Sequence, residues 1–244
     1  MLEHLPSEIT WHILSFLHVR DLASLRLICK RLQVLCDYPA HWRHVTLIPE
    51  VSGSLSSKLS PCHSPSLWQL SELRSIIAPH RMHIRSIHIW GVRDTIVRYL
   101  LEQCPLLEKL SLCSWTTLSD HAFKLPLPRR LRLRHLELIS RSATSYVAMD
   151  SNCLGRLFTM CPDLQKLVLT CPSHIRAQTL VKQFKRHRPS ELMILTMIVQ
   201  REWPENLESD ILAACPGLKQ LCLQQCMLPA PVSDVLPKLT LESH

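Results

Sequence analysis

The stretch CPLLEKLSL at residues 104–112 recurs with few changes as CPDLQKLVL at 161–169 and as CPGLKQLCL at 215–223. Its cysteines lie 57 and 54 positions apart (104 to 161, and 161 to 215), roughly twice the 20 to 29 residues of one kind of strand–helix repeat. The Cys-Pro pair suits the end of a helix, because proline cannot continue one. The apolar alternation that follows is typical of a strand. The repeats therefore predict alternating strands and helices.

Weaker copies fill the gaps between the three stretches. Each copy contains an apolar-x-x-apolar-x-apolar core, and the cores begin at Ile84, Leu107, Leu133, Leu164, Leu192, Leu218 and, in a shortened form, Leu236. Amphipathic segments lie between them, among them one that Asp94 would cap and one that includes Leu207, Ile211 and Leu212. We therefore predict an α/β fold for residues 67–244: six to seven irregular units stacked into a curved solenoid with a parallel sheet on its concave face.

Strand geometry predicts which side chains face the concave surface. Side chains alternate along a strand, so positions three, five and seven of each core point away from the buried positions four and six. Position three of successive cores includes Lys109, His135 and Lys166, which we call the basic ladder, and position seven of the first core is Trp90. One interpretation is a strip that docks an acidic or phosphorylated segment, with Trp90 as an apolar anchor. The other is an ordinary solvated face.

The first 49 residues predict a small helical module. Pro6 suits the first turn of a helix, and Asp21 suits the N-cap of a second helix that Pro39 closes. Apolar residues recur at helical spacing in both segments: Ile9, Ile13, Phe16 and Leu17, then Leu22, Leu25, Cys29, Leu32 and Cys36. Trp42, Val45 and Leu47 follow and lead toward the repeats. A module of this size buries little surface alone, so it requires a partner or serves as a cap on its neighbour.

The segment from Leu5 to Leu47 resembles the F-box family. The shared features are Leu5-Pro6, the apolar helix positions and the Cys29-Lys30-Arg31 triplet with a downstream Trp42. The resemblance implies a three-helix module that binds a Skp-family adaptor through eight residues: Leu5, Pro6, Ile9, Ile13, Leu14, Leu17, Leu22 and Leu25. Residues 67–244 are similar to the cysteine-containing leucine-rich repeats that commonly follow an F-box.

Residues 50–66 separate these two regions and are rich in serine and proline, which predicts a linker. Its Ser-Pro pairs are possible kinase targets. A helix is expected next, capped by Ser66, with Leu70, Leu73 and Ile77 on one side and Pro79 at its end.

Composition excludes several classes of protein. The 11 cysteines are odd in number and follow no expected secretory signal, which argues for reduced cysteines in a cytoplasmic or nuclear protein. No Cys-x-x-Cys pair predicts zinc, and the pairs His41/His44 and His80/His83 are expected to be surface histidines. We expect no catalytic centre, no cofactor and no membrane span. The basic clusters 129–135 and 182–188 and the net charge of +8 permit nucleic-acid binding, although this is the less favoured interpretation.

The combined features predict a substrate receptor of an SCF-type ubiquitin ligase, connected through the adaptor to a cullin scaffold. The repeats would hold an unidentified protein target, and the contribution to catalysis would be proximity. The alternative is a repeat-built interaction scaffold whose F-box serves assembly without ubiquitin transfer.

Overall fold

A computed structural model of the protein describes residues 5–48, 67–115, 117–125, 130–139, 146–170, 175–199 and 204–225. Outside these ranges lies the predicted linker 50–66, which includes the predicted cap Ser66. The shortened core at Leu236 and Arg129 of the first basic cluster lie outside them as well. The described residues contain no helix long and apolar enough to cross a membrane.

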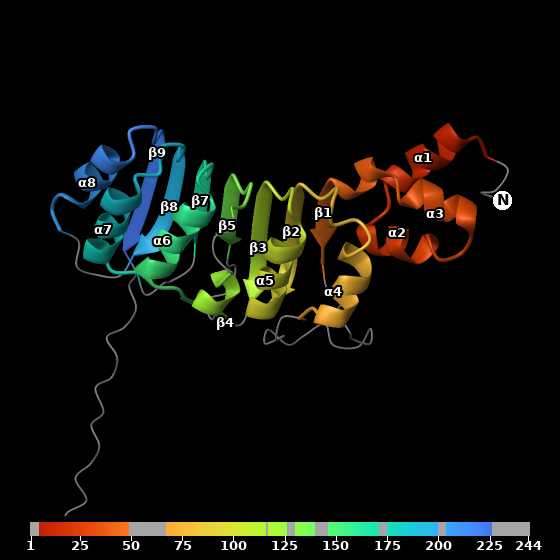
Figure 1. The fold of residues 1–244 in the computed structure, drawn as a ribbon, viewed down its shortest axis with the longest axis horizontal. Coiled ribbons are helices and arrows are strands. Elements are labelled where there is room, and N and C mark those ends of the chain that lie inside the picture. Colours follow the sequence, from red (N-terminus) through yellow and green to blue (C-terminus); the bar gives the residue numbers. More distant parts are fainter. Residues whose placement is uncertain are drawn as a thin grey trace, which may run out of the picture.

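A parallel sheet of seven strands runs along most of the molecule (Figure 1). Its neighbours follow chain order, and its strands are β1 (His44–Leu47), β2 (Ser86–Val92), β3 (Lys109–Trp115), β5 (His135–Ile139), β7 (Lys166–Leu169), β8 (Ile194–Val199) and β9 (Gln220–Gln225). A second, two-stranded parallel sheet pairs β4 (Thr117–Ser119) with β6 (Tyr146–Ala148). The predicted mixed α/β class and parallel sheet are thus confirmed.

Helices follow the strands and form a second row beside the sheet (Figure 1). They are α4 (Leu70–Ile77), α5 (Asp94–Gln103), the 3₁₀ turn η3 (Asp120–Phe123), α6 (Ser151–Met160), α7 (Ala177–His187) and α8 (Leu207–Ala214). From α5 onward each packs against the next. The core lies between the two rows, where apolar residues at positions four and six are buried in β2, β3, β5, β7 and β8 and partly buried in β9.

One backbone arrangement repeats from strand to strand. The carbonyl of Arg43 accepts hydrogen bonds from the N–H groups of both Arg85 and Ser86, at 3.0 and 2.9 Å. The same forked contact recurs at five further carbonyls, those of Arg85, Glu108, Arg134, Gln165 and Met193. Each of these six residues lies one position before a strand. Successive units are therefore stacked in the same way, including the first, which begins at Arg43.

Three cysteines occupy one structural position. Cys104, Cys161 and Cys215 are the C-cap residues of α5, α6 and α8, and each is buried. Each backbone N–H donates to the last turn of its helix, and each carbonyl accepts from the leucine three residues on. Burial raises the pKa of the Cys161 thiol to about 12 and that of Cys215 to about 11. The repeated cysteines are therefore small packing residues, and Cys161 and Cys215 are held as neutral thiols.

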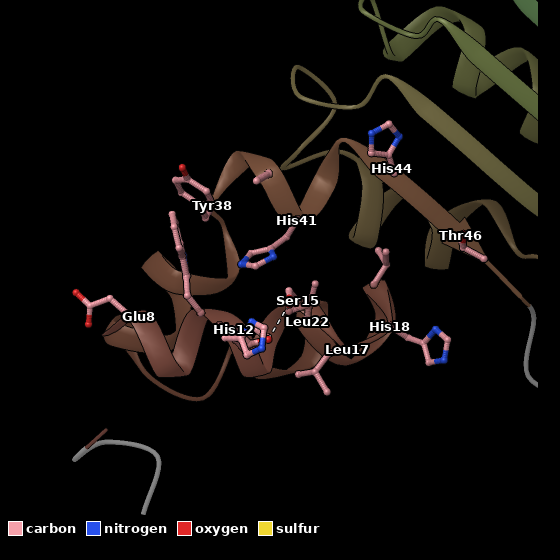
Figure 2. A pocket seen from close by; sticks show the side chains of 14 residues that line it. Glu8, His12, Ser15, Leu17, His18, Leu22, Tyr38, His41, His44 and Thr46 are labelled. Atoms are coloured by element: carbon pink, nitrogen blue, oxygen red, sulfur yellow. Dashed lines mark hydrogen bonds between the residues drawn. The ribbon is translucent and has the colours of Figure 1, made fainter. Parts of the chain in front are cut away.

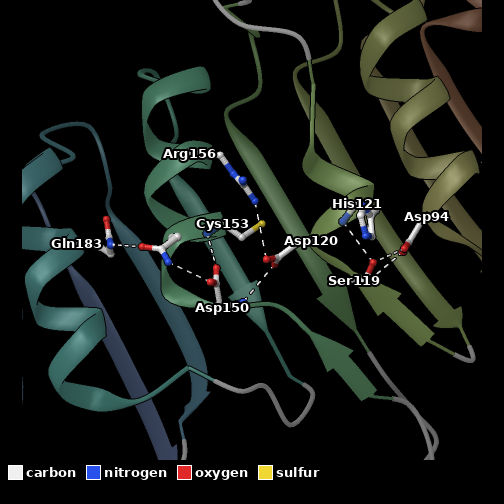
Figure 3. A network of polar contacts seen from close by, with 9 residues as sticks. Asp94, Ser119, Asp120, His121, Asp150, Cys153, Arg156 and Gln183 are labelled. Atoms are coloured by element: carbon white, nitrogen blue, oxygen red, sulfur yellow. Dashed lines mark hydrogen bonds and ion pairs between the residues drawn. The ribbon is translucent and has the colours of Figure 1, made fainter.

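Polar side chains connect the helix N-termini below the sheet (Figure 3). The Asp94 carboxylate accepts a 2.9 Å hydrogen bond from the Ser119 N–H and contacts the Ser119 hydroxyl. The N-cap of α5 is Arg93, so the prediction that Asp94 caps this helix by its own side chain was wrong. Asp94 is instead the first helical residue, and it holds the neighbouring unit through β4.

A second link in this network joins η3 to α6. Asp120 accepts a 3.2 Å hydrogen bond from the Asp150 N–H, and Arg156 lies 3.8 Å from the Asp120 carboxylate. Asp150 is a true N-cap, because its side chain accepts from the Cys153 N–H at 2.7 Å. These contacts cross between units at the ends of helices, where backbone N–H groups need partners.

The N-terminal module contains three helices: α1 (Ser7–Ser15), α2 (Val19–Leu25) and α3 (Lys30–Cys36). The predicted single second helix is divided, and its N-cap is His18 while Asp21 lies in the first turn. Residues 26–29 break the helix, and Arg26 makes two hydrogen bonds with Asp37, at 2.7 and 2.9 Å. This bidentate contact ties the end of α2 to the end of α3, so the two short helices pack as a hairpin. Likewise α4 begins at Leu70, later than the predicted cap at Ser66.

Candidate functional site

The three-helix module has a small core of its own. Leu14, Leu22, Leu32 and Cys36 are buried. Arg31 donates a 2.7 Å hydrogen bond to the carbonyl of Leu5, which fixes the start of the module against α3. The module is thus closed on the inside, and several of its other apolar residues face outward.

The structure divides the eight predicted adaptor-binding residues into three groups. Pro6, Ile9 and Ile13 are exposed, and the two isoleucines lie on one face of α1. Leu5, Leu17 and Leu25 are half-buried. Leu14 and Leu22 are each only 2% exposed, so in this structure they pack the module rather than face a partner.

Several outward apolar residues were missed by the sequence analysis. Phe16 is 76% exposed, and Leu27, Ile28 and Val34 are also largely exposed. These four side chains add to the apolar surface that the module leaves exposed. For Leu27, Ile28 and Val34 the available signal was their position, because each is a large apolar residue outside the predicted stripe of the second helix. Phe16 was part of the predicted stripe of the first helix.

A hollow of about 690 Å³ lies between this module and the first strand of the sheet (Figure 2). Trp11 and Tyr38 form one wall, with ring centroids 3.8 Å apart. Four histidines also line it: His12, His18, His41 and His44. Burial lowers the pKa of His41. In the described ranges no three histidine, cysteine or carboxylate side chains lie close enough together to hold a metal ion, here or elsewhere.

The module joins the sheet through continuous chain and through side chains. The 3₁₀ turn η2 (Pro39–Trp42) leads directly into β1, which pairs with β2 from His44–Ser86 to Leu47–Ile89. Trp42 is fully buried and stacks on His80. The prediction that His80 is a surface histidine was therefore wrong. It is 2% exposed, because the turn after α4 folds back over the module.

A second contact reinforces this joint. The guanidinium of Arg20 in α2 lies 4.3 Å from the centre of the Trp68 ring and forms an ion pair with Glu72 of α4. The module is therefore held to α4 as well as to β1.

The open face of the sheet, defined as positions three and five of the strands, follows the predicted register. Lys109 pairs with His135 and His135 pairs with Lys166, so the basic ladder is continuous across β3, β5 and β7. Ladder side chains are exposed or half-buried, whereas the intervening leucines are buried. Trp90 is half-buried and lies opposite Cys113 of β3. Cys113 is four residues beyond Lys109 along that strand, so Trp90 lies about 13 Å further along the strand direction than the ladder. The structure thus unites the ladder but does not bring Trp90 to it.

The ladder carries less charge than its sequence suggests. Lys166 forms an ion pair with Glu137, with 2.6 Å between Nζ and Oε1. Burial lowers the pKa of His135, and the neighbouring charges of Lys109 and Lys166 lower it further. Protonation of His135 is therefore disfavoured, and Lys109 is the ladder's cation without a carboxylate partner among the described residues.

Comparison with known protein families identifies the module. Residues 2–48 match the F-box-like family. The match coincides with α1, α2, α3, η2 and β1, so the chain carries an N-terminal F-box-like domain, as the resemblance implied. No curated protein is detectably similar to the chain. An F-box-like domain indicates an adaptor-binding or protein-interaction role, and such domains typically bind Skp-family adaptors.

Proposed function

We propose that this protein is a substrate receptor of an SCF-type ubiquitin ligase. The observation that carries the proposal is the F-box-like match over residues 2–48, in a module whose apolar side chains Ile9, Ile13 and Phe16 face solvent. Burial of such side chains against a Skp-family adaptor would remove a large apolar area from water, which drives association. The adaptor in turn would connect the chain to a cullin.

We further propose that residues 67–244, together with β1, are leucine-rich repeats that hold the protein target. Two features support this assignment. The forked carbonyl contact recurs once per structural unit, and the C-cap cysteines of α5, α6 and α8 occupy corresponding positions. A stacked array presents one long surface, and the open face would serve as that surface. The ladder residues Lys109, His135 and Lys166 and the more distant Trp90 are its candidate target contacts.

The proposed contribution to ubiquitin transfer is positional and requires no catalytic group in this chain. The joint between the module and the sheet supports such a role, because Trp42 and Arg20 fix the direction in which the sheet extends from the adaptor. Target lysines held on the sheet would then stay near a ubiquitin-charged enzyme. We place this activity in the cytoplasm or the nucleus, where cysteines stay reduced.

Adaptor co-purification tests the proposal. Leu5→Ala combined with Pro6→Ala should abolish co-purification of a Skp-family adaptor, while circular dichroism shows the sheet still folded. Undiminished adaptor binding would refute the assignment of this protein as a substrate receptor. Recovery of adaptor without cullin, and without ubiquitin conjugates of any bound protein, would favour the assembly scaffold instead.

A further inference from the structure

The N-terminal ends of five neighbouring strands each present one cation. They form two adjacent rows at this edge of the sheet. Lys109 of β3 and Lys166 of β7 occupy position three, whereas Arg43 beside β1, Arg85 beside β2 and Arg134 beside β5 stand one position earlier, just before their strands. The five strands lie side by side in this order (Figure 1). We call these five residues the basic strip. Only two of them belong to the basic ladder, because the three arginines lie one position before their strands.

Backbone contacts fix the spacing of the basic strip. The carbonyl of Arg43 binds the N–H of Arg85, and the carbonyl of Arg85 binds the N–H of Lys109. The carbonyl of Arg134 similarly binds the N–H of Lys166. Neighbouring strands are about 4.8 Å apart, so the strip is roughly 19 Å long.

Most of this charge is available to a partner. Arg43, Lys109 and Arg134 are exposed, and none has a carboxylate within ion-pair distance in the part of the chain that the structure describes. Two carboxylates lie beside the strip: Glu108 is 3.5 Å from Arg85, and Glu137 binds Lys166. The strip ends beyond β7, where the equivalent residues are Met193 and Ile194.

We propose that the basic strip binds an extended acidic segment of another protein, one that carries several aspartate or glutamate side chains. A segment of about six extended residues matches the length of the strip. The cations are distributed one per strand and do not converge on one point, which suits single carboxylate charges better than one phosphate dianion. The inference rests on the proposed role of the sheet in holding targets.

The strip also begins at the joint with the F-box-like domain, since Arg43 directly follows η2. A segment bound there would be held at the end of the sheet nearest the adaptor. This position would bring the bound protein close to the assembled ligase.

Binding of a fluorescein-labelled octaglutamate peptide to the full chain in complex with its adaptor tests the inference. Lys109→Glu combined with Arg134→Glu should weaken binding at least tenfold at 50 mM salt. The matched control reverses two exposed cations of α7, with Lys182→Glu and Arg186→Glu, and should change binding less than twofold. Lys109→Gln with Arg134→Gln should give an intermediate loss, and unchanged thermal unfolding of all variants shows that they are folded.

Three outcomes would overturn the inference. Equal losses in the strip and control variants would mean that net charge alone attracts the peptide. Tighter binding of a peptide with one phosphoserine than of octaglutamate would assign the strip to phosphate. Stronger competition by a twelve-residue oligothymidine would assign it to nucleic acid. Adaptor co-purification is measured on the same preparations, so a failure of the strip remains distinct from a failure of the proposed function.

Discussion

The indole ring of Trp42 lies almost flat on the imidazole of His80, with ring centroids 3.5 Å apart and planes inclined by 13°. The indole N–H donates a 2.7 Å hydrogen bond to the carbonyl of Cys36, the last residue of α3. Trp42 therefore contacts the F-box-like domain through its nitrogen and the turn after α4 through its ring face. This pair joins the two parts of the molecule.

Trp42→Ala should destabilise the protein by about 3–5 kcal/mol, since truncation of a buried aromatic side chain leaves a cavity and here also an unpaired Cys36 carbonyl. Denaturant unfolding of the adaptor-bound chain measures the loss. Trp90→Ala is the matched control, because Trp90 is half-buried on the open face, and its smaller loss should leave the joint intact. Equal losses for the two variants would contradict the role assigned to Trp42.

Stability should fall when the pH drops from about 6.5 to about 4. Burial lowers the pKa of His80 to about 4, although the nearby Asp37 partly opposes the shift. An unfolded histidine titrates near 6.5, so between these values the unfolded chain binds a proton that the folded chain does not. The free energy of unfolding that is lost through His80 is at most about 3 kcal/mol. This loss is absent above pH 7 and reaches its full size below pH 4.

His80→Phe isolates this effect, since phenylalanine keeps a ring against Trp42 but cannot titrate. Its unfolding free energy should vary less between pH 7 and pH 5 than that of the unmodified chain. His135→Phe serves for comparison, because the pKa of His135 is also lowered but its ring lies on the open face. An identical pH dependence before and after His80→Phe would refute the prediction.

Ile13→Asp or Phe16→Asp should weaken adaptor binding at least tenfold. Both side chains are exposed, at 40% and 76%, so the change should alter the free energy of unfolding by less than about 1 kcal/mol. The affinities are measured by titrating each variant over adaptor that is immobilised on a surface. Met82→Asp places the same charge at an exposed apolar residue outside the F-box-like domain and should have no effect on them.

Gly217→Ala should be destabilising, whereas Gly155→Ala should be tolerated. A methyl group at Gly217 would lie 2.7 Å from the backbone oxygen of Ser190 in the preceding unit, which cannot move without disturbing the stack. At Gly155 the obstructing atoms belong to the flexible side chains of Gln183 and His187, and alanine favours a helix. The free energy of unfolding, measured by thermal unfolding, should therefore fall by at least about 1 kcal/mol more for Gly217→Ala than for Gly155→Ala.

The buried cysteines should resist thiol reagents in the folded protein. Burial raises the pKa of Cys153 and of Cys161 to about 12, so neither forms a thiolate at pH 7.5. Cys29 and Cys222 are half-buried and should react first among the described cysteines. Peptide mapping after brief treatment with N-ethylmaleimide checks the order, and early labelling of Cys161 would contradict it.

The periodic features of this protein could be predicted from its amino-acid sequence alone. The CPLLEKLSL copies predicted parallel strands and placed Lys109, His135 and Lys166 side by side, because side-chain alternation and unit length are local properties that repeats make visible. The Leu5–Leu47 resemblance likewise located the F-box-like domain. These inferences needed no knowledge of distant contacts.

The contacts between units, and the charges that stay unpaired, depend on the folded arrangement. It buried His80 under Trp42, turned Asp94 toward Ser119 and neutralised Lys166 with Glu137. It also made β1 the first strand of the sheet, although Trp42, Val45 and Leu47 had indicated only a connection toward it. Each result depends on the approach of residues far apart in the chain, where burial and pairing set the free energy and local pattern carries no signal.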